Sequence, residues 1–252
     1  MSPLQLERSD PPQVVVPGPP KDIAKRSFIQ RLFTDLAPRY DWFNRLASFG
    51  LDQRWRREAM RRGGVGPGQR VLDVCAGTGD LAILCAQRLR GEGAVIGIDF
   101  TAAMLAHAAR KQQARGLQIT WLRGDALSLP FADGSFDRVV IGFSTRNLAD
   151  LTAGLREMMR VLRSHGQLII LETGRPANPL IRAGYQAFLF TAARMIGFLL
   201  TGRCWPFTYL ARSVRHFLTP QEFVDRLQRL GTAAVYVPLS GGLASLYVAT
   251  KQ

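Results

Sequence analysis

Cysteine is scarce in this chain of 252 residues, which contains only Cys75, Cys85 and Cys204. An odd number of cysteines without C-x-x-C spacing excludes a disulfide framework and a cysteine-based zinc site. The opening residues, MSPLQLERSDPP, hold no apolar signal core, and the chain has no internal repeat. We therefore expect an intracellular protein without disulfide bonds.

Lysine and acidic residues are also few, and almost every cation is an arginine. Lysine and arginine together number 33 against 19 aspartates and glutamates, a net charge of +14. The excess lies at the flanks: residues 21–70 hold 12 cations and 5 anions, residues 176–252 hold 8 and 2, and residues 71–175 hold 12 and 10. Such flanks are either solvated helix faces or a surface for an anionic partner. Zinc-finger, RNP and basic-zipper patterns are missing, which favours a membrane surface over nucleic acid.

The hydrophobic pattern predicts a sheet of short strands alternating with helices. Residues 21–62 form a helical region, which GGVGPG at 63–68 ends. Strands are expected at 71–74, 94–98, 119–122, 136–141 and 168–171, with helices at 81–89, 102–110 and 151–162, and the chain closes with a helix at 220–230 and strands at 233–238 and 244–250. This alternation predicts an α/β fold with helices on both faces of a parallel sheet and a ligand at the carboxyl ends of its strands.

Residues 183–202 form a strongly apolar stretch whose only charge is Arg194. The stretch is close to membrane-spanning length. A central arginine costs roughly 2.5–3.5 kcal/mol on insertion scales, however. We therefore expect a buried helix or a lid over an apolar pocket rather than a membrane span.

The segment VLDVCAGTGDLA at 71–82 is the most informative part of the chain. A strand runs into Gly77, Thr78 and Gly79 and then into a helix, whose free N–H groups lie where a ligand can approach. Asp99 closes the next expected strand, where a carboxylate can accept hydrogen bonds from both ribose hydroxyls of a nucleoside cofactor. A turn with two glycines and an aspartate that caps a strand would give the same pattern.

This loop also fits the pattern G-x-G-x-x-A of NAD-dependent dehydrogenases. A dinucleotide needs its pyrophosphate at the helix start, which nearby acids would repel. S-adenosylmethionine carries a sulfonium cation and an amino group instead, and these groups favour acids. Because Asp73 precedes the loop and Asp80 follows it directly, the sequence favours S-adenosylmethionine.

The chain resembles the UbiE/MenG family of C-methyltransferases of ubiquinone and menaquinone biosynthesis, a branch of the class I S-adenosylmethionine-dependent methyltransferases. The matching motifs are VLDVCAGTGDLA with VIGIDFTAAML at 95–105, RYDWFN at 39–44, SFGLDQRWR at 48–56, GDALSLPFADGSFD at 124–137 and GFSTRNLAD at 142–150. The resemblance implies a Rossmann-like fold with a mostly parallel seven-stranded sheet, an N-terminal helical cap and a helical insert before the last two strands, which would face the substrate or the membrane. After a disordered tail at 1–20 it implies one domain at 21–252, made of a helical cap at 21–66, a cofactor-binding core at 67–175, an apolar insert at 176–218 and a terminal helix with two strands at 219–252.

The resemblance also implies the cofactor contacts. Thr78 would contact the cofactor, Asp99 would bind its ribose, and Asp125 with Ala126 would lie against its adenine, the carboxylate facing the exocyclic amine. Where the family often has serine after the fourth strand this chain has Gly142, which leaves only a backbone contact there. Asp73, Gly77 and Gly79 complete the expected cofactor site.

For the chemistry, the resemblance points to Arg146 and Asn147 beside the oxygens of the substrate, with Tyr40 and Asp41 closing over cofactor and ring. Arg146 could instead only pair with Asp150, and Tyr40 could only fill the core. The three histidines are scattered and form no convincing metal cluster, so no metal is expected. They are His107, His165 and His216, the last a weak candidate for the proton acceptor.

The implied reaction is C-methylation of a polyprenylated aromatic quinol, with demethylmenaquinol as the leading substrate. The benzoquinol of ubiquinone synthesis, another lipophilic molecule, an NAD-binding oxidoreductase and a scaffold for membrane or RNA remain as alternatives. Since a prenyl tail stays in the bilayer, we expect a cytoplasmic enzyme at the inner face of an anionic membrane, with the apolar insert at the interface. Nucleic acid is not expected as a partner, and a homodimer is left open.

Overall fold

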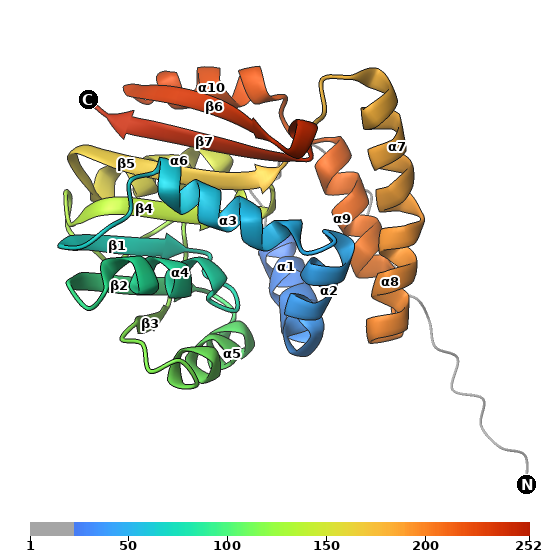
Figure 1. Cartoon of the computed structure of the whole chain (residues 1–252), viewed down its shortest axis with the longest axis horizontal. Helices are drawn as coiled ribbons and strands as arrows, with labels where there is room; N and C mark the ends of the chain where they lie inside the picture. Colours follow the sequence, from blue (N-terminus) through green and yellow to red (C-terminus); the bar gives the residue numbers. More distant parts are fainter. Residues whose placement is uncertain (1–22) are drawn as a thin grey trace, which may run out of the picture.

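The structure is a computed structural model that describes residues 23–252, so the expected tail at 1–20 lies outside the described residues. Seven strands form one sheet in the order β3-β2-β1-β4-β5-β7-β6 (Figure 1). The strands from β3 to β5 are parallel, and β7 runs antiparallel to both β5 and β6. Their bounds are β1 Gln69–Val74, β2 Gly93–Asp99, β3 Thr120–Arg123, β4 Phe136–Gly142, β5 Leu162–Thr173, β6 Thr232–Leu239 and β7 Ala244–Lys251. The expected class I methyltransferase fold is confirmed.

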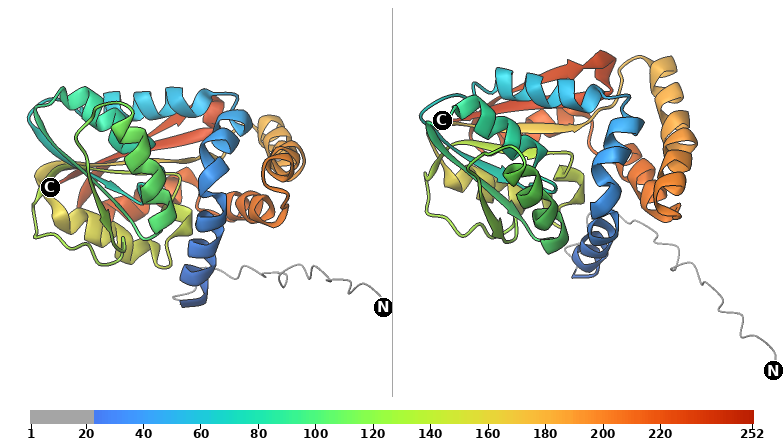
Figure 2. Two further views of the ribbon diagram at one scale, coloured as in Figure 1. Left: turned by 90° about the horizontal axis from the view of Figure 1, so that it is seen from below. Right: turned by 60° about the horizontal axis from the view of Figure 1, so that its bottom comes forward.

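Helices cover both faces of this sheet, as Figure 2 shows from below. On one face α3 (Leu51–Arg62) and α4 (Asp80–Leu89) pack on alternate residues of the central strands. On the same face α5 (Ala102–Gln113) lies beside α4 over β2 and β3, with its Ala108 and the Trp121 ring next to Gly79. On the other face α6 (Leu151–Val161) and α10 (Pro220–Gln228) pack on the sheet. Burial on both sides explains why the central strands are continuous apolar runs.

A separate group of helices stands at the carboxyl ends of the parallel strands (Figure 1). It consists of α1 (Ile23–Leu36), α2 (Tyr40–Ala47), α8 (Ala192–Thr201) and α9 (Trp205–Arg215), which share an apolar cluster of their own. The rings of Phe43 and Phe207 lie 4.4 Å apart at its centre. A Cβ atom on Gly197 would lie 2.1 Å from the Phe207 ring, so glycine lets α8 approach α9 closely.

The apolar stretch at 183–202 is divided between α7 (Pro179–Phe190) and α8, with a break at Thr191. Only 17% of its most apolar window is buried, so the expectation of a buried helix is wrong. Within residues 23–252, Pro179–Thr201 is the one segment long and apolar enough to cross a membrane, at a mean hydropathy of 1.3. One side of these helices packs on α9 through Leu189 and Ala193, and the other side covers the outer surface of the helical group. The alternative expectation, a lid over an apolar pocket, stays a prediction.

Candidate active site

A cavity of about 690 Å³, counting the part open to solvent, lies at the carboxyl ends of β1, β2 and β4. The glycine loop between β1 and α4 forms one wall, and α1 and α2 close the opposite side. Seven of the residues expected in the cofactor site or in catalysis line this cavity. They are Tyr40, Asp73, Gly77, Thr78, Asp99, Gly142 and Asn147. The topology thus places the expected loop, the two strand-end acids and the turn after β4 around one space.

The glycine loop turns sharply because both of its glycines adopt positive φ angles, +56° at Gly77 and +83° at Gly79. A Cβ atom at Gly77 would meet nothing nearer than 4.0 Å, so the loop leaves room for a ligand there. Gly79 has a different role, since its Cβ would lie 2.6 Å from the Trp121 ring. Gly77 therefore shapes the cavity, and Gly79 lets the loop pack on the sheet.

Asp99 ends β2 with its carboxylate buried beside this loop. One oxygen accepts the Gly77 N–H at 2.9 Å, and the other accepts the Thr101 N–H at 2.8 Å. Burial raises the pKa of Asp99, and the backbone hydrogen bonds only partly offset this increase. Each oxygen retains lone-pair capacity for a further donor, and the residue lines both this cavity and the one next to it.

Asp73 is almost fully buried at the end of β1 and lines the same cavity. Its carboxylate accepts the Ala82 N–H at 2.9 Å and so binds the first turn of α4. Burial raises the pKa of Asp73 to about 8. A cationic ligand group in the cavity would favour the ionised form of this carboxylate.

Arg56 of α3 is a buried cation on the cavity wall that the sequence analysis did not single out. Its Nη1 donates to Asp52 at 2.7 Å, its Nη2 lies 3.7 Å from Asp80, and its guanidinium stacks on the Phe143 ring. The cavity therefore presents Asp73 and Arg56 together. A zwitterionic amino-acid group needs a pair of this kind, one acid for its ammonium and one cation for its carboxylate.

A second cavity adjoins the first and contains the expected adenine residues Asp125 and Ala126. The Asp125 carboxylate accepts the Leu127 N–H at 3.1 Å, and its other oxygen forms an ion pair with Arg26 of α1. The carboxylate expected to face an adenine amine thus has a cationic partner from the helical group. Cys75, Asp99, Asn147 and other residues line both cavities, so the two form adjoining parts of one site.

Gly142 lies on the cavity wall at the end of β4. A Cβ atom at this position would lie 2.7 Å from Cδ1 of Leu81. A serine here would require Leu81 to move, which gives a physical reason for glycine in this chain.

Arg146 follows β4 in the short turn η2 (Thr145–Asn147), and its partner is Glu172 near the end of β5. The alternative pairing with Asp150 is wrong, because Asp150 caps α6 and accepts the Ala153 N–H at 3.0 Å. Burial alone would lower the pKa of Arg146, but Glu172 raises it above its ordinary value. The guanidinium is a permanent cation and cannot serve as a base.

Asn147 connects this turn to the cavities. Its Oδ1 accepts the Tyr209 hydroxyl of α9 at 3.1 Å, which leaves the amide N–H₂ group as a donor. Tyr40 lines the cavity and packs edge-on against Phe33, with ring centres 5.7 Å apart, so it forms both the wall and part of the core. Burial raises the pKa of Tyr40 and raises that of Tyr209 to about 12, so both hydroxyls stay protonated.

Asp41 does not line either cavity wall and instead binds the glycine loop. Its Oδ1 accepts the Thr78 hydroxyl at 2.5 Å, and its Oδ2 accepts Lys111 Nζ of α5 at 2.7 Å. Lys111 also pairs with Asp80 at the start of α4. The helical group is thereby fastened to the loop by one carboxylate.

The sequence analysis missed four side chains of this region: Arg56, Glu172, Tyr185 and Tyr209. Arg56 stood inside the motif SFGLDQRWR, and its place there was the available signal. Within residues 23–252 no three His, Cys, Asp or Glu side chains gather as a metal site requires. His216 is exposed at the end of α9, where its Nδ1 lies 2.9 Å from the Arg212 carbonyl, outside both cavities.

Comparison with known proteins agrees with this geometry. Residues 21–251 match the model of the ubiE/COQ5 methyltransferase family. The chain belongs to this family. A demethylmenaquinone methyltransferase of Thermus thermophilus is 40% identical over 87% of this chain and 100% of its own length. The ubiquinone/menaquinone biosynthesis C-methyltransferase UbiE of Geotalea uraniireducens is 36% identical over 88% and 96%.

Solved structures support the fold of this ubiE/COQ5 family member. A SAM-dependent methyltransferase of Thermotoga maritima superposes with a TM-score of 0.62 at 16% identity, over 89% of this chain and 100% of its own. The protein is a methyltransferase, and its cofactor is S-adenosylmethionine. The cavity fits S-adenosylmethionine, since the open space at Gly77 is lined by the carboxylates of Asp99 and Asp73 and by the guanidinium of Arg56.

Proposed function

We propose that this enzyme transfers the methyl group of S-adenosylmethionine to a ring carbon of demethylmenaquinol in menaquinone biosynthesis. The names and near full-length identity of its relatives support this substrate class. The observation on which the proposal chiefly rests is the turn after β4. Its Asn147 lines both cavities and accepts the Tyr209 hydroxyl of α9. Arg146, the residue before it, lines neither cavity and pairs with Glu172 of β5.

The cofactor assignments follow from the cavity walls. Asp99 would accept the ribose hydroxyls, and Asp125 with Ala126 would lie against the adenine in the second cavity. Asp73 and Arg56 would hold the ammonium and carboxylate of the amino-acid end. Gly77, Thr78, Gly79 and Gly142 would supply backbone contacts and shape around them.

The bound cofactor supplies an electrophilic methyl group on a sulfonium. The side chains of the enzyme then have to orient a quinol so that a ring carbon attacks this methyl in line. Arg146 would stabilise the oxygen that loses its proton, and the Asn147 amide would hold it in place. Tyr40 would form the wall over the ring, and Asp41 would keep the helical group closed by binding Thr78. The ring proton leaves last, to water or another acceptor.

A second substrate has direct support in the relatives' names. Three relatives that are 36–38% identical to this chain are named ubiquinone/menaquinone biosynthesis C-methyltransferase, a name that covers both pathways. The alternative is therefore C-methylation of a 2-polyprenyl-6-methoxy-1,4-benzoquinol.

The decisive experiment offers both quinols in one reaction. The enzyme is incubated with S-adenosylmethionine, demethylmenaquinol and the benzoquinol under reducing conditions, and the quinones are read by mass spectrometry. A product one methyl heavier from demethylmenaquinol alone supports the leading substrate, and one from both identifies a dual enzyme. If neither is methylated while S-adenosylhomocysteine still binds, the substrate proposal is wrong. Arg146→Lys, which keeps the charge, serves as the site variant and should lose most of the activity.

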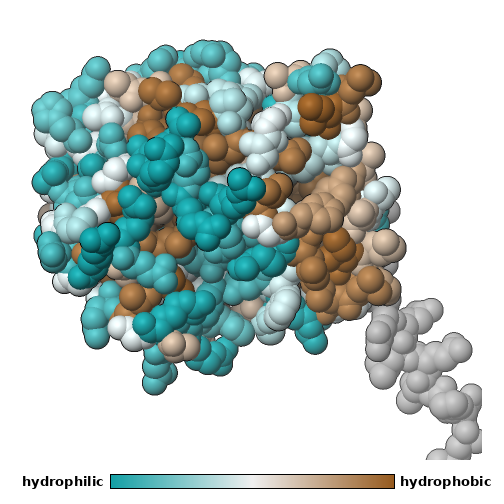
Figure 3. Space-filling view, viewed as in Figure 1, coloured by the Kyte–Doolittle hydropathy of each residue, from teal (hydrophilic) through white to brown (hydrophobic). Residues whose placement is uncertain are grey.

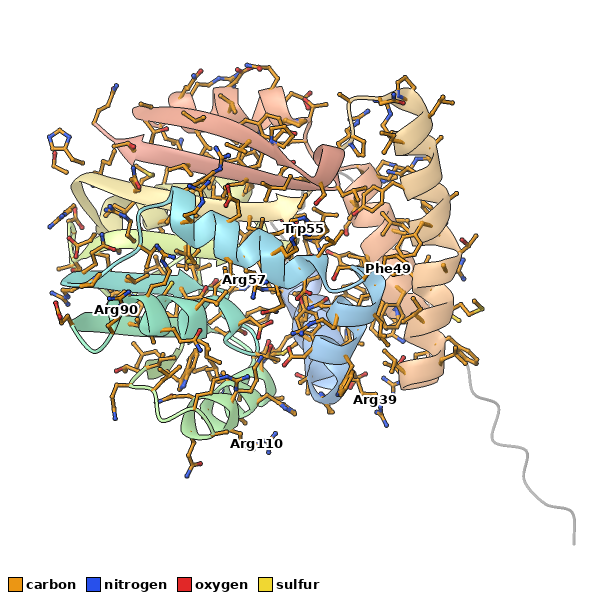
Figure 4. All side chains as sticks on the ribbon, viewed as in Figure 1. Arg39, Phe49, Trp55, Arg57, Arg90 and Arg110 are labelled. Atoms are coloured by element: carbon orange, nitrogen blue, oxygen red, sulfur yellow. The ribbon has the colours of Figure 1, made fainter. Side chains whose placement is uncertain are left out.

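The protein also presents a surface suited to a membrane. Figure 3 shows apolar residues gathered on the side formed by α7 and α8. The large apolar side chains exposed on α2, α7, α8 and the turn after α2 are Trp42, Leu46, Phe49, Leu180, Ile181, Met195, Phe198 and Leu199. Phe49 is 80% exposed, and its ring lies 5.8 Å from that of Phe188, so the turn after α2 continues the α7 surface (Figure 4). We call these eight residues the apolar patch.

We propose that the apolar patch rests on an anionic bilayer that holds the prenyl tail of the substrate. Arg39 and Arg45 are exposed on or beside α2 at the same end of the molecule, and residues 176–252 carry 8 cations against 2 anions. Each cation near an anionic surface is worth about 1 kcal/mol, and each apolar side chain that leaves water adds about 1.5–3 kcal/mol when fully buried. The enzyme would thus be peripheral, at the inner face of the membrane.

Vesicle sedimentation tests this surface. The wild-type protein should bind phosphatidylglycerol vesicles at low salt and release them at high salt. A triple variant, Phe49→Ser, Leu180→Ser and Leu199→Ser, should bind at least roughly tenfold more weakly. Val235→Ser is the matched control, because Val235 is exposed on β6 away from the apolar patch. If the triple variant binds vesicles as tightly as the wild type, the proposal is wrong. If the wild type is a dimer in solution and only the triple variant is a monomer, the apolar patch binds a second copy of the chain instead.

A further inference from the structure

Glu172 is the least exposed acid near the turn that carries Arg146, with 1% of its surface accessible. Its Oε2 accepts the Thr145 hydroxyl at 2.6 Å and the Arg146 N–H at 3.3 Å. Its Oε1 accepts the Thr173 N–H at 2.8 Å and forms an ion pair with the Arg146 guanidinium. Adjacent parallel strands bring this acid and the turn together, since Gly142 of β4 pairs with Leu171 of β5.

These donors fill the acceptor capacity of the carboxylate. A carboxylate offers about four lone-pair sites, and Glu172 already receives two backbone N–H groups, the hydroxyls of Thr145 and Thr173 and a guanidinium. No site is left to receive a proton from a substrate. Glu172 is therefore an anchor for its donors and not the general base of the reaction.

The guanidinium of Arg146 is held by one nitrogen only. Nη1 donates to Glu172 and to the Phe143 carbonyl, the latter at 2.7 Å, which uses both of its hydrogens. Nε is buried without a hydrogen-bond partner. An unpaired buried donor is costly unless a ligand supplies an acceptor, and the Nε–Nη2 edge of arginine matches an anionic oxygen.

The surroundings of this free edge suit an aromatic ring. Arg146 lies close enough to act electrostatically on three phenols from three helices: Tyr40 of α2, Tyr185 of α7 and Tyr209 of α9. Tyr209 donates to Asn147, which lines both cavities. The Arg146 side chain therefore lies in an aromatic region that adjoins the cofactor cavity through Tyr40 and Asn147.

We infer that Glu172 is a positioning residue for methyl transfer: it fixes Nη1 of Arg146 so that the Nε–Nη2 edge holds the oxygen of the quinol. This inference rests on the proposed function, because it assigns Arg146 to the substrate oxygen. Glu172 acts only through Arg146 and touches neither substrate nor cofactor.

Kinetics of Glu172→Gln on the full chain test the inference. The variant keeps the shape of the side chain but turns one anchoring oxygen into a donor, so Arg146 is no longer held. We expect kcat to fall roughly a hundredfold, with the KM for S-adenosylmethionine and the Kd for S-adenosylhomocysteine within about twofold of wild type. Glu58→Gln is the control, because Glu58 pairs with Arg61 and Arg62 on the outer face of α3, and it should leave kcat unchanged.

A double-variant cycle separates positioning from a general structural role. In the Arg146→Ala background, Glu172→Gln should cause no further loss of kcat, because the residue it positions is gone. An equal loss in both backgrounds would overturn the inference, as would a wild-type kcat for Glu172→Gln in an active enzyme. If Glu172→Gln does not fold, Glu172→Asp, which withdraws the carboxylate by one methylene, takes its place in the same cycle. A wild-type enzyme that methylates neither quinol overturns the proposed function and the inference together.

Discussion

The hydroxyl of Thr78 in the glycine loop donates a hydrogen bond of 2.5 Å to the carboxylate of Asp41 on α2. The same carboxylate accepts Lys111 of α5, so one side chain joins the helical group to two elements of the cofactor-binding core. This contact closes the cavity on the side away from the sheet. It predicts that the residence time of the cofactor depends on a residue outside the cavity wall.

Replacing Asp41 with Asn should speed the dissociation of S-adenosylhomocysteine. A hydrogen bond to a charged group is worth about 1.5–3 kcal/mol, so the rate constant should rise roughly ten- to a hundredfold. Stopped-flow displacement measures this rate. Asp133→Asn is the control, since Asp133 is exposed and pairs with Arg160 away from the site. An unchanged rate would show that the contact with Thr78 does not hold the helical group closed.

Replacing Asp99 with Asn or Ala should abolish cofactor binding. The Asp99 carboxylate is the acceptor proposed for the ribose hydroxyls, and an amide cannot accept from both of them while it keeps its two backbone contacts. S-adenosylhomocysteine should raise the melting temperature of the wild-type protein, and NADH should not. If S-adenosylhomocysteine raises the melting temperature of the variant as much as that of the wild type, Asp99 does not bind the ribose. If NADH raises the melting temperature of the wild type, the site binds a dinucleotide.

Replacing Arg26 with Ala should strengthen cofactor binding. In the structure Arg26 pairs with Asp125, and the adenine amine would need the same carboxylate. The pair is half-exposed, so its loss should change the Kd for S-adenosylhomocysteine by no more than about fivefold, as expected of a surface ion pair. Calorimetry with the wild type and with Arg31→Ala, an exposed arginine on the same helix, provides the comparison. Weaker binding in Arg26→Ala would mean that Arg26 contacts the cofactor.

The ligand-free protein should lose stability as pH rises from about 4 to about 8, in part because of Asp73. Its pKa is about 8 in the folded protein and 3.8 in the unfolded chain, so the folded state binds the extra proton throughout this range. The stability that this proton contributes is fully present below pH 3.8 and is lost above about pH 8. Melting temperatures across this range should show a smaller slope for Asp73→Asn, whose amide can still accept the Ala82 N–H. An identical slope would show that Asp73 is ionised in the ligand-free state.

The sequence predicted the parts of the structure that depend on local pattern. The strand before the glycine loop, the helix after it and the final strand pair all follow from short apolar runs bounded by glycine or aspartate. β5 begins at Leu162 rather than at the expected residue 168, because polar residues continue the strand where it is exposed. The expectation of a helical region at 21–62 was correct for the described residues 23–62, although it did not separate α1, α2 and α3.

What the sequence could not predict depends on contacts between distant segments. Glu172 ends an apolar strand like any capping acid, and only the pairing of β4 with β5 places it against Arg146. The helix α9 was expected only as an undivided part of the helical insert at 176–218, since it is mixed in polarity and follows a stretch that reads as one long apolar segment. For the same stretch the sequence left open a buried helix or a lid over an apolar pocket, because composition alone does not distinguish a core helix from an apolar surface.

Lys25 of α1 donates to the carbonyl of Leu148 at 2.7 Å and to that of Arg146 at 3.4 Å. The helix that covers the second cavity is thus bonded to the backbone of the turn that presents the arginine. Displacement of α1 would remove both of these contacts from the turn at the same moment. We therefore expect a quinol to be held in its reacting pose only when α1 lies over the bound nucleoside, so turnover should obey ordered kinetics with the methyl donor first.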